Sequence, residues 1–238
     1  GYRVGLFTSP HIRDIRERIR VNGQMIPQRQ LTRLLAAAKP KIDRMTDRPT
    51  FFEIMTALAF CHFAEEKVDI AVVEAGLGGR LDSTNVLSPA VCGLTSISID
   101  HTHQLGDSIA EIAAEKAGIF KAEVPVVSVA QDKEAKSILQ KQAKETHSRL
   151  MFTGEDIDFS YRVESSRDAG CHTRICLTTP QSRFEHLPVP VLGEHQAINC
   201  GLALALLDQL KLQGMDIDDK RAISGLAGVE LPGRMELL

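Results

Sequence analysis

The chain has 238 residues, of which 43% are hydrophobic and 25% charged, and a formal net charge of −3. This length suits one large α/β domain or two small ones with a sizeable core, while the mixed charge without a long basic run argues against nucleic-acid binding. No apolar run approaches the roughly 18 residues of a membrane span. The five cysteines are scattered and form no CxxC pair, so the sequence indicates neither a zinc site nor a disulfide framework. Their odd number fits a reducing cytoplasm.

The first two thirds of the chain are expected to alternate strands and helices. In chain order, we expect a strand at 2–9, a helix at 29–45 interrupted by Pro40, a helix at 50–67, strands at 68–75 and 90–99, a helix at 108–120, a strand at 124–130 and a helix at 133–147. The continuous apolar run VDIAVVEA at 68–75 indicates a parallel strand covered on both faces. This alternation predicts an α/β fold with a doubly wound, mostly parallel sheet flanked by helices.

The pattern changes near Met151. Short strands are expected at 151–164, 171–179 and 183–192, which indicates a small β excursion near residues 150–192 on the edge of the domain. A helix is expected at 193–214, and a shorter one from about Asp218. We expect residues 1–230 to form one domain, and residues 231–238, LPGRMELL, to begin a linker to another.

Polar residues follow two of the predicted strands where those strands end. Glu74 closes the first of these strands, and Asp100 and His101 close the next. In doubly wound sheets, ligands bind beyond the carboxyl ends of the strands, so a carboxylate and an imidazole are expected in one crevice. Spacing alone leaves open a capping or loop-stabilising role for Glu74, and a simple polar turn at His101 and His103.

A glycine-rich turn follows Glu74. Gly76, Gly78 and Gly79 permit positive φ angles and close backbone approach. No lysine and hydroxyl residue follow them, so the turn is not a Walker A phosphate loop. We expect it to let Asp82 and Asn85 point back into the crevice and shape a substrate and metal pocket.

Lys116 lies in the predicted last turn of the helix at 108–120, where cations are favoured. By itself it is better interpreted as an exposed helical lysine near Glu111 and Glu115.

Six segments, in this order, resemble the folylpolyglutamate synthase / dihydrofolate synthase family of the Mur ligase superfamily. They are TSPHIRDIRERIRVNG, TFFEIMTALAF, EAGLGGRLDSTN, SIDHTHQLGDSIAEIAAEKAGIF, GEHQAINCGLAL and LPGRME. The resemblance implies a P-loop NTPase-like Mur ligase central domain. It also implies a cytoplasmic, monomeric, ATP-dependent amide ligase of folate biosynthesis and one-carbon metabolism. Such an enzyme adds L-glutamate to a folate or dihydropteroate carboxylate through an acyl phosphate, with two magnesium ions.

The resemblance also implies roles for individual residues. Ser9 and Glu74 match ligands of the first Mg²⁺, and His101 matches the residue at the second. Lys116 matches a catalytic lysine that is carbamylated, which requires a neutral amine. Two segments match substrate contacts: Thr50, Phe51, Phe52 and Glu53, and Leu81, Asp82 and Ser83. Asn199 and Arg234 match ATP contacts.

The chain also departs from the family pattern. The Walker A segment is expected before Gly1, and a glutamate-binding C-terminal domain after Leu238. We therefore expect this chain to be the central part of a longer enzyme and inactive by itself. Two competing hypotheses are a non-catalytic pterin- or nucleotide-binding module and a metal hydrolase using Glu74, His101 and His103. The resemblance covers both addition of the first glutamate and extension of the tail.

Overall fold

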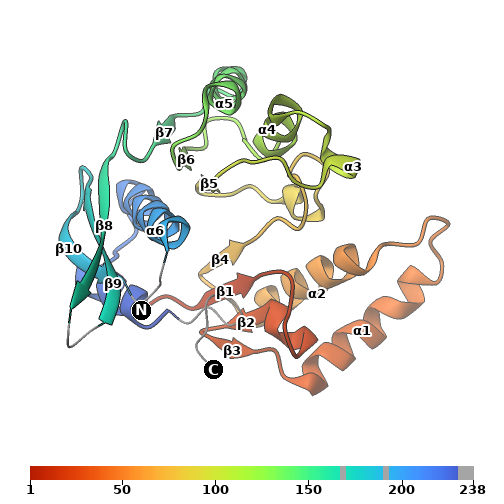
Figure 1. Ribbon diagram of the computed structural model, residues 1–238. Helices are drawn as coiled ribbons and strands as arrows, with labels where there is room; N and C mark the ends of the chain where they lie inside the picture. Colours follow the sequence, from red (N-terminus) through yellow and green to blue (C-terminus); the bar gives the residue numbers. More distant parts are fainter. Residues whose placement is uncertain (167–169, 190–192, 230–238) are drawn as a thin grey trace. The chain divides into compact units, whose positions relative to one another are not determined.

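The computed structural model describes residues 1–166, 170–189 and 193–229 (Figure 1). The chain divides into two compact units, Gly1–Leu87 and Ser88–Leu238. The first unit has one sheet and one buried apolar cluster, and the described part of the second has two sheets and two such clusters.

The first unit is built on a four-stranded sheet in the order β3-β2-β1-β4 (Figure 1). Strand β1 (Val4–Phe7) pairs in parallel with β4 (Ile70–Val73) and antiparallel with β2 (Ile19–Val21), which in turn pairs with β3 (Gln24–Met25). Phe7 lies opposite both Ile19 and Val73. The parallel pairing brings the carboxyl ends of β1 and β4 to the same edge of the sheet.

Two helices accompany this sheet, α1 (Gln28–Ile42) and α2 (Phe51–Glu65). The apolar residues of α2 pack with Phe7, Ile19 and other sheet residues in one fully buried cluster. Helix α1 does not stop at Pro40, as its sequence led us to expect, but runs to Ile42. Because Pro40 lies in the last turn, its missing N–H removes a backbone bond only near the end of the helix.

Strand β4 differs from the expectation of a strand covered on both faces. Ala71 and Val72 are both exposed, and the Val72 side chain keeps 55% of its accessible surface. Successive residues of a strand point to opposite faces, so neither face of β4 is fully covered. In the described sheet β4 is an edge strand with β1 as its one partner.

The second unit contains a parallel sheet of β5 (Cys92–Leu94), β6 (Val126–Ser128) and β7 (Leu150–Phe152). The intervening helices are α3 (Thr102–Leu105), α4 (Ile109–Ala117) and α5 (Lys133–Glu145). Residues of β5, β6, α4 and α5 share one buried apolar cluster that includes Val126, Ile112 and Leu139. This half of the unit is the strand–helix alternation expected from the sequence.

The β excursion is a three-stranded antiparallel sheet of β8 (Asp158–Ser166), β9 (Gly170–Thr178) and β10 (Arg183–Val189). It begins later than expected, because residues 150–152 join the parallel sheet as β7.

The last two helices are α6 (Glu194–Leu212) and α7 (Asp219–Ala227). Helix α6 packs so closely on the excursion that a Cβ added at Gly201 would lie 2.3 Å from the Phe159 ring. The helix therefore fastens the excursion to the parallel sheet through one shared apolar cluster.

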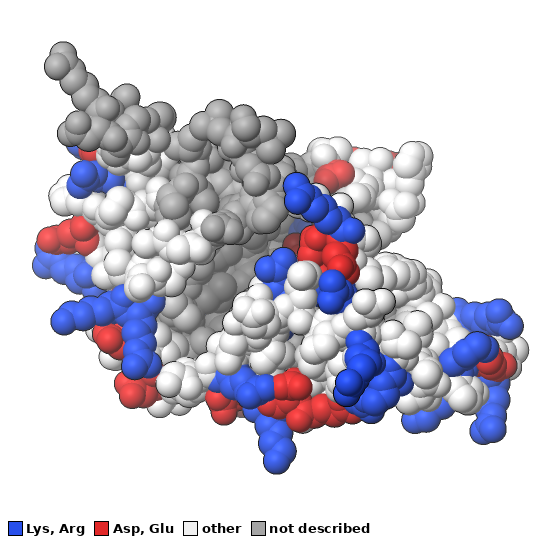
Figure 2. All heavy atoms as spheres, turned by 90° about the horizontal axis from the view of Figure 1, so that it is seen from below, with Lys and Arg blue, Asp and Glu red and all other residues white. Residues whose placement is uncertain are grey.

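The described surface carries charges of both signs. On the face shown in Figure 2, basic and acidic side chains lie among one another, in keeping with the small net charge. Within the described ranges, no helix combines the length and the apolar character needed to cross a bilayer.

Candidate functional site

The carboxyl ends of β1 and β4 are joined by Ser9 and Glu74. The Glu74 backbone N–H donates to the Phe7 carbonyl at 2.9 Å, which continues the ladder one residue beyond β4. The Ser9 N–H then donates to Glu74 Oε2 at 2.7 Å. The structure thus brings together two residues that are 65 positions apart in the sequence.

This junction offers oxygen donors of the kind that Mg²⁺ prefers. Ser9 is half-buried, and Glu74 is exposed. A serine hydroxyl and a carboxylate fit a hard cation that keeps several of its waters. The described part of the chain contains no cluster of three or more His, Cys, Asp or Glu residues suited to a metal. Ser9 and Glu74 provide two ligands, so water or substrate would supply the remaining ligands of a Mg²⁺ ion held there.

The glycine-rich turn after Glu74 is organised by the Asp82 carboxylate. Asp82 Oδ2 accepts the backbone N–H groups of Gly76 and Leu77 at 2.8 and 2.9 Å. Asp82 Oδ1 accepts the N–H and hydroxyl of Thr84 at 2.9 and 2.6 Å. A carboxylate has room for about four such bonds, so Asp82 is fully engaged. The structure therefore directs the Asp82 carboxylate at donors of the turn itself, whereas the sequence led us to expect it to point back into the crevice.

The turn is also fastened to α2. The Ser83 and Thr56 hydroxyls lie 2.8 Å apart. A Cβ at Gly76 would lie 2.4 Å from Cζ of Phe52, so the ring rests directly on the turn. Of the three glycines in the turn, Gly78 is the one with a positive φ, at 67°. Gly76 is thus required for close approach and Gly78 for backbone conformation.

The predicted substrate segment at the start of α2 contains two kinds of residue. Thr50 and Glu53 cap the helix reciprocally, with bonds of 2.6 and 3.2 Å, and these bonds hold the pKa of Glu53 below its usual value. Phe52 packs on Phe7, with ring centroids 5.6 Å apart. Phe51 is 52% exposed, so in this segment it offers the open aromatic surface.

Leu81, in the second predicted substrate segment, is 79% exposed. Ser83 of that segment is held by Thr56, as described above, so Leu81 is its most accessible member.

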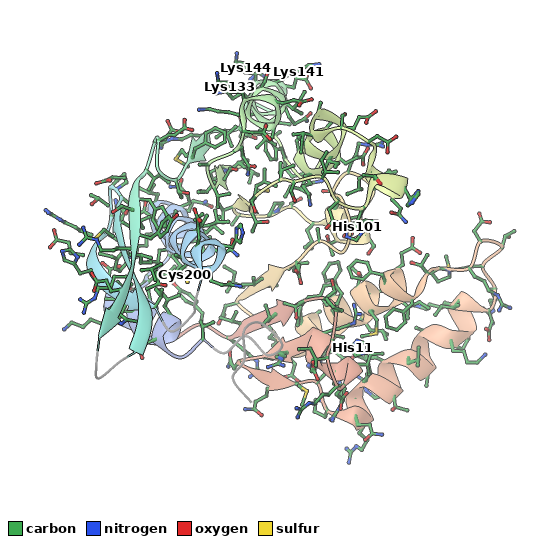
Figure 3. The ribbon with its side chains drawn as sticks, in the orientation of Figure 1. His11, His101, Lys133, Lys141, Lys144 and Cys200 are labelled. Carbon is green, nitrogen blue, oxygen red and sulfur yellow. The ribbon has the colours of Figure 1, made fainter. Side chains whose placement is uncertain are left out.

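Three further predicted site residues belong to the second unit. His101 precedes α3 in a left-handed conformation, with φ of 51°, and its side chain is 57% exposed (Figure 3). Its N–H donates to Oδ1 of Asp100 at 2.7 Å, and its Nε2 lies 3.6 Å from Oδ2 of the same residue. Lys116 is half-buried in the last turn of α4. Asn199 is half-buried near the start of α6.

Arg234, predicted to contact ATP, lies outside the described residues.

Sequence reasoning missed Arg18 and His11, on the segment that follows Ser9. Arg18 is only 8% exposed, and its Nε donates to Nδ1 of His11 at 2.9 Å. Its guanidinium lies 5.3 Å from the centroid of the Phe51 ring. The segment contains five arginine and histidine residues, and neither spacing nor periodicity singles out the buried one.

Comparisons with known proteins agree on one family. The sequence profile described as "Mur ligase middle domain" matches residues 24–207. The chain is 38% identical over 244 residues to the "Dihydrofolate synthase/folylpolyglutamate synthase" of Bacillus subtilis, covering 100% of this chain and 56% of the relative. The chain thus spans about half the length of this curated relative.

Solved structures give the same result. A mutant of the folylpolyglutamate synthase of L. casei superposes with a TM-score of 0.92 at 31% identity, over 100% of this chain and 59% of that one. The E. coli FolC protein in complex with DHPP and ADP superposes with a TM-score of 0.84 at 31% identity, over 100% and 53%. The chain is therefore similar over its whole length to part of these proteins.

Proposed function

Because the chain belongs to the Mur ligase middle-domain family, we propose that it is the ATP- and substrate-binding part of a folylpolyglutamate or dihydrofolate synthase. The reaction joins L-glutamate to a carboxylate of folate or dihydropteroate and uses one ATP. The similarity to a B. subtilis protein named for both activities supports this substrate class. A relative solved with DHPP and ADP supports binding of a pterin compound and a nucleotide to this fold.

The reaction has two steps. A carboxylate oxygen of the pterin substrate attacks the γ-phosphorus of ATP, and ADP leaves. The glutamate amine then attacks the acyl phosphate carbon, and phosphate and a proton leave. Magnesium at two sites would neutralise charge on the phosphate oxygens.

Within this proposal, Ser9 and Glu74 hold the first magnesium, and His101 lies at the second. Lys116 carries a carbamate, formed when its neutral amine adds to carbon dioxide with loss of a proton. Asn199 and Arg234 contact ATP.

The two predicted substrate segments bind the pterin compound. Phe51 and Leu81 are the members with the most exposed side chains and make the direct contacts. Asp82 holds the shape of the glycine-rich turn that carries Leu81.

The observation that carries the proposal is the Ser9–Glu74 junction at the shared carboxyl edge of β1 and β4. Ligands of open α/β sheets bind at this edge, and the junction exposes oxygen donors there. The proposal also places the protein in the cytoplasm as a monomer acting on small molecules. Free thiols at Cys61, Cys92, Cys176 and Cys200 support a reducing compartment.

The test uses the whole protein that carries this chain. The measured quantity is ADP release that depends on both L-glutamate and a reduced folate or dihydropteroate. We expect turnover in the wild type and none above background in Glu74→Gln, which keeps the size of the side chain but removes its charge. Glu145→Gln, at an exposed position in α5, is the matched control and should keep full activity. Binding of substrate and ATP without any turnover in the wild type would contradict the ligase and favour a non-catalytic binding module.

A further inference from the structure

Arg18 is a buried cation whose hydrogen bonds are incomplete. It ends the 3₁₀ turn η1 (Ile15–Arg18), just before β2, and is 8% exposed. A guanidinium carries five N–H donors, and among the described residues Arg18 uses only Nε, which donates to His11. The other four N–H groups of the guanidinium have no partner in the described part of the chain.

The acidic residues near Arg18 are engaged elsewhere. Glu17 accepts the backbone N–H groups of Ile12, Arg13 and Asp14 at 2.8 to 3.0 Å. Asp14 pairs with Arg16, and these bonds lower the pKa of Asp14 to about 2. No Asp or Glu of the described ranges forms an ion pair with Arg18. A buried charge normally has such a counter-charge, because burying it alone is unfavourable.

The neighbours of Arg18 hold its guanidinium in one orientation. Nδ1 of His11 accepts the Arg18 Nε–H, so it carries no proton, and the imidazole can donate only through Nε2. The guanidinium lies over the Phe51 ring, 5.3 Å from its centroid, while about half of the Phe51 surface remains open. His11 itself lies on the loop between β1 and η1, two residues after Ser9 (Figure 3).

We propose that Arg18 is an anion-binding residue of the substrate site and takes a carboxylate of an aromatic substrate. The aromatic part of the ligand stacks on the exposed surface of Phe51. The carboxylate accepts two hydrogen bonds from the unused N–H groups of Arg18, as a bidentate pair. The class of substrate rests on the proposed function, whereas the need for an anion rests on Arg18 alone.

The first test needs no variant. Calorimetric titration of the protein in EDTA, without magnesium, compares 4-aminobenzoylglutamate with its diamide. The two ligands share the aromatic ring and differ in charge, and chelation removes any attraction of the carboxylate to a metal. We expect the carboxylate form to bind about 10- to 100-fold more tightly, as a charge-assisted pair would give. Equal affinity for the two ligands would overturn the proposal.

The second test asks whether the preference depends on Arg18. In Arg18→Gln the preference for the carboxylate form should vanish. In Arg18→Lys, which keeps the charge but not the planar fork, we expect a preference reduced about 10-fold. Arg13→Gln is the matched control, because Arg13 is an exposed arginine five residues before Arg18, and it should bind like the wild type. A full preference retained in Arg18→Gln would contradict the proposal.

A third measurement separates a carboxylate site from a phosphate site. Affinity for an ATP analogue should be the same in the wild type and Arg18→Gln, and a parallel loss for the nucleotide would assign Arg18 to phosphate instead. These three binding measurements do not depend on whether the protein shows ligase activity. Loss of the carboxylate preference in Arg18→Gln would support the site even in a protein without turnover. An active ligase indifferent to Arg18→Gln would defeat this inference and leave the proposed function standing.

Discussion

Two loops of the molecule carry predicted metal-site residues, and they are held in different ways. The turn after Glu74, in the first unit, is fixed by the four bonds to Asp82, by the Ser83–Thr56 contact and by the Phe52 ring on Gly76. The segment around His101, in the second unit, is held by backbone bonds of α3 and by the buried Leu105, while the described side-chain contact of His101 is with its neighbour Asp100. One predicted half of the site is therefore built before any ligand arrives, whereas the other is held only locally.

The difference has a consequence for binding. A preorganised loop loses little conformational freedom when a ligand binds, so most of its interaction energy appears as affinity. The His101 side chain is largely exposed, so a ligand that binds it would have to fix its rotamer, at a cost in side-chain entropy. We therefore expect substitutions in the first loop to affect stability more than substitutions in the second.

The largest effect is expected from Asp82→Ala, which removes four hydrogen bonds to a charged acceptor. The free energy of unfolding, measured by urea denaturation, should fall by about 3 kcal/mol. Asp100→Ala is the corresponding change in the second loop and should cost less than about 1 kcal/mol, because it removes only local contacts of His101. Similar losses in the two variants would refute the contrast between the loops.

An intermediate effect is expected from Gly76→Ala. The new methyl group would overlap the Phe52 ring and lower the free energy of unfolding by about 1–3 kcal/mol. Gly225→Ala is the matched control, because nothing lies within 4 Å of its added Cβ in helix α7, and it should stabilise by about 0.5–1 kcal/mol. The double variant Gly76→Ala with Phe52→Leu should recover part of the loss. If the two changes simply add, Phe52 is not what limits the space at Gly76.

The smallest effect on stability is expected from His101→Gly. Glycine adopts the φ of 51° without strain, and the side chain makes few contacts, so stability should change by less than about 0.5 kcal/mol. The ligase activity of the whole protein should nevertheless fall sharply if His101 lies at the second magnesium. Unchanged activity in a stable His101→Gly protein would remove His101 from the site.

Local chemistry explains what the sequence could predict. The starts of α2 and α4 follow from pairs of capping residues three positions apart, Thr50 with Glu53 and Ser108 with Glu111. Their hydrogen bonds form within one helical turn. The parallel strands β4, β5 and β6 follow from apolar runs between helices. The apolar run at 68–75 also predicts that Glu74 lies at a strand end. Only the family resemblance indicates its partner, Ser9.

Tertiary packing decides what the sequence could not show. The hairpin of β2 and β3 is too short to leave a pattern, with three and two residues. The burial of Arg18 depends on its position beside Phe51, which comes from a different helix. The inward orientation of Asp82 depends on backbone donors that a turn exposes only after it has folded.

The pairing of β1 with β4 also bears on the order in which the chain folds. Ser9 and Glu74 meet across 65 positions, whereas Cys176 and His186, on adjacent strands of the β excursion, meet across 10. Closing the longer loop costs about 1.7 kcal/mol more chain entropy than closing the shorter one. Contacts of low sequence separation form early, and those of high separation form late. We therefore expect the β excursion to form early in folding and the Ser9–Glu74 junction to form after α1 and α2, which lie between the two paired strands in the sequence.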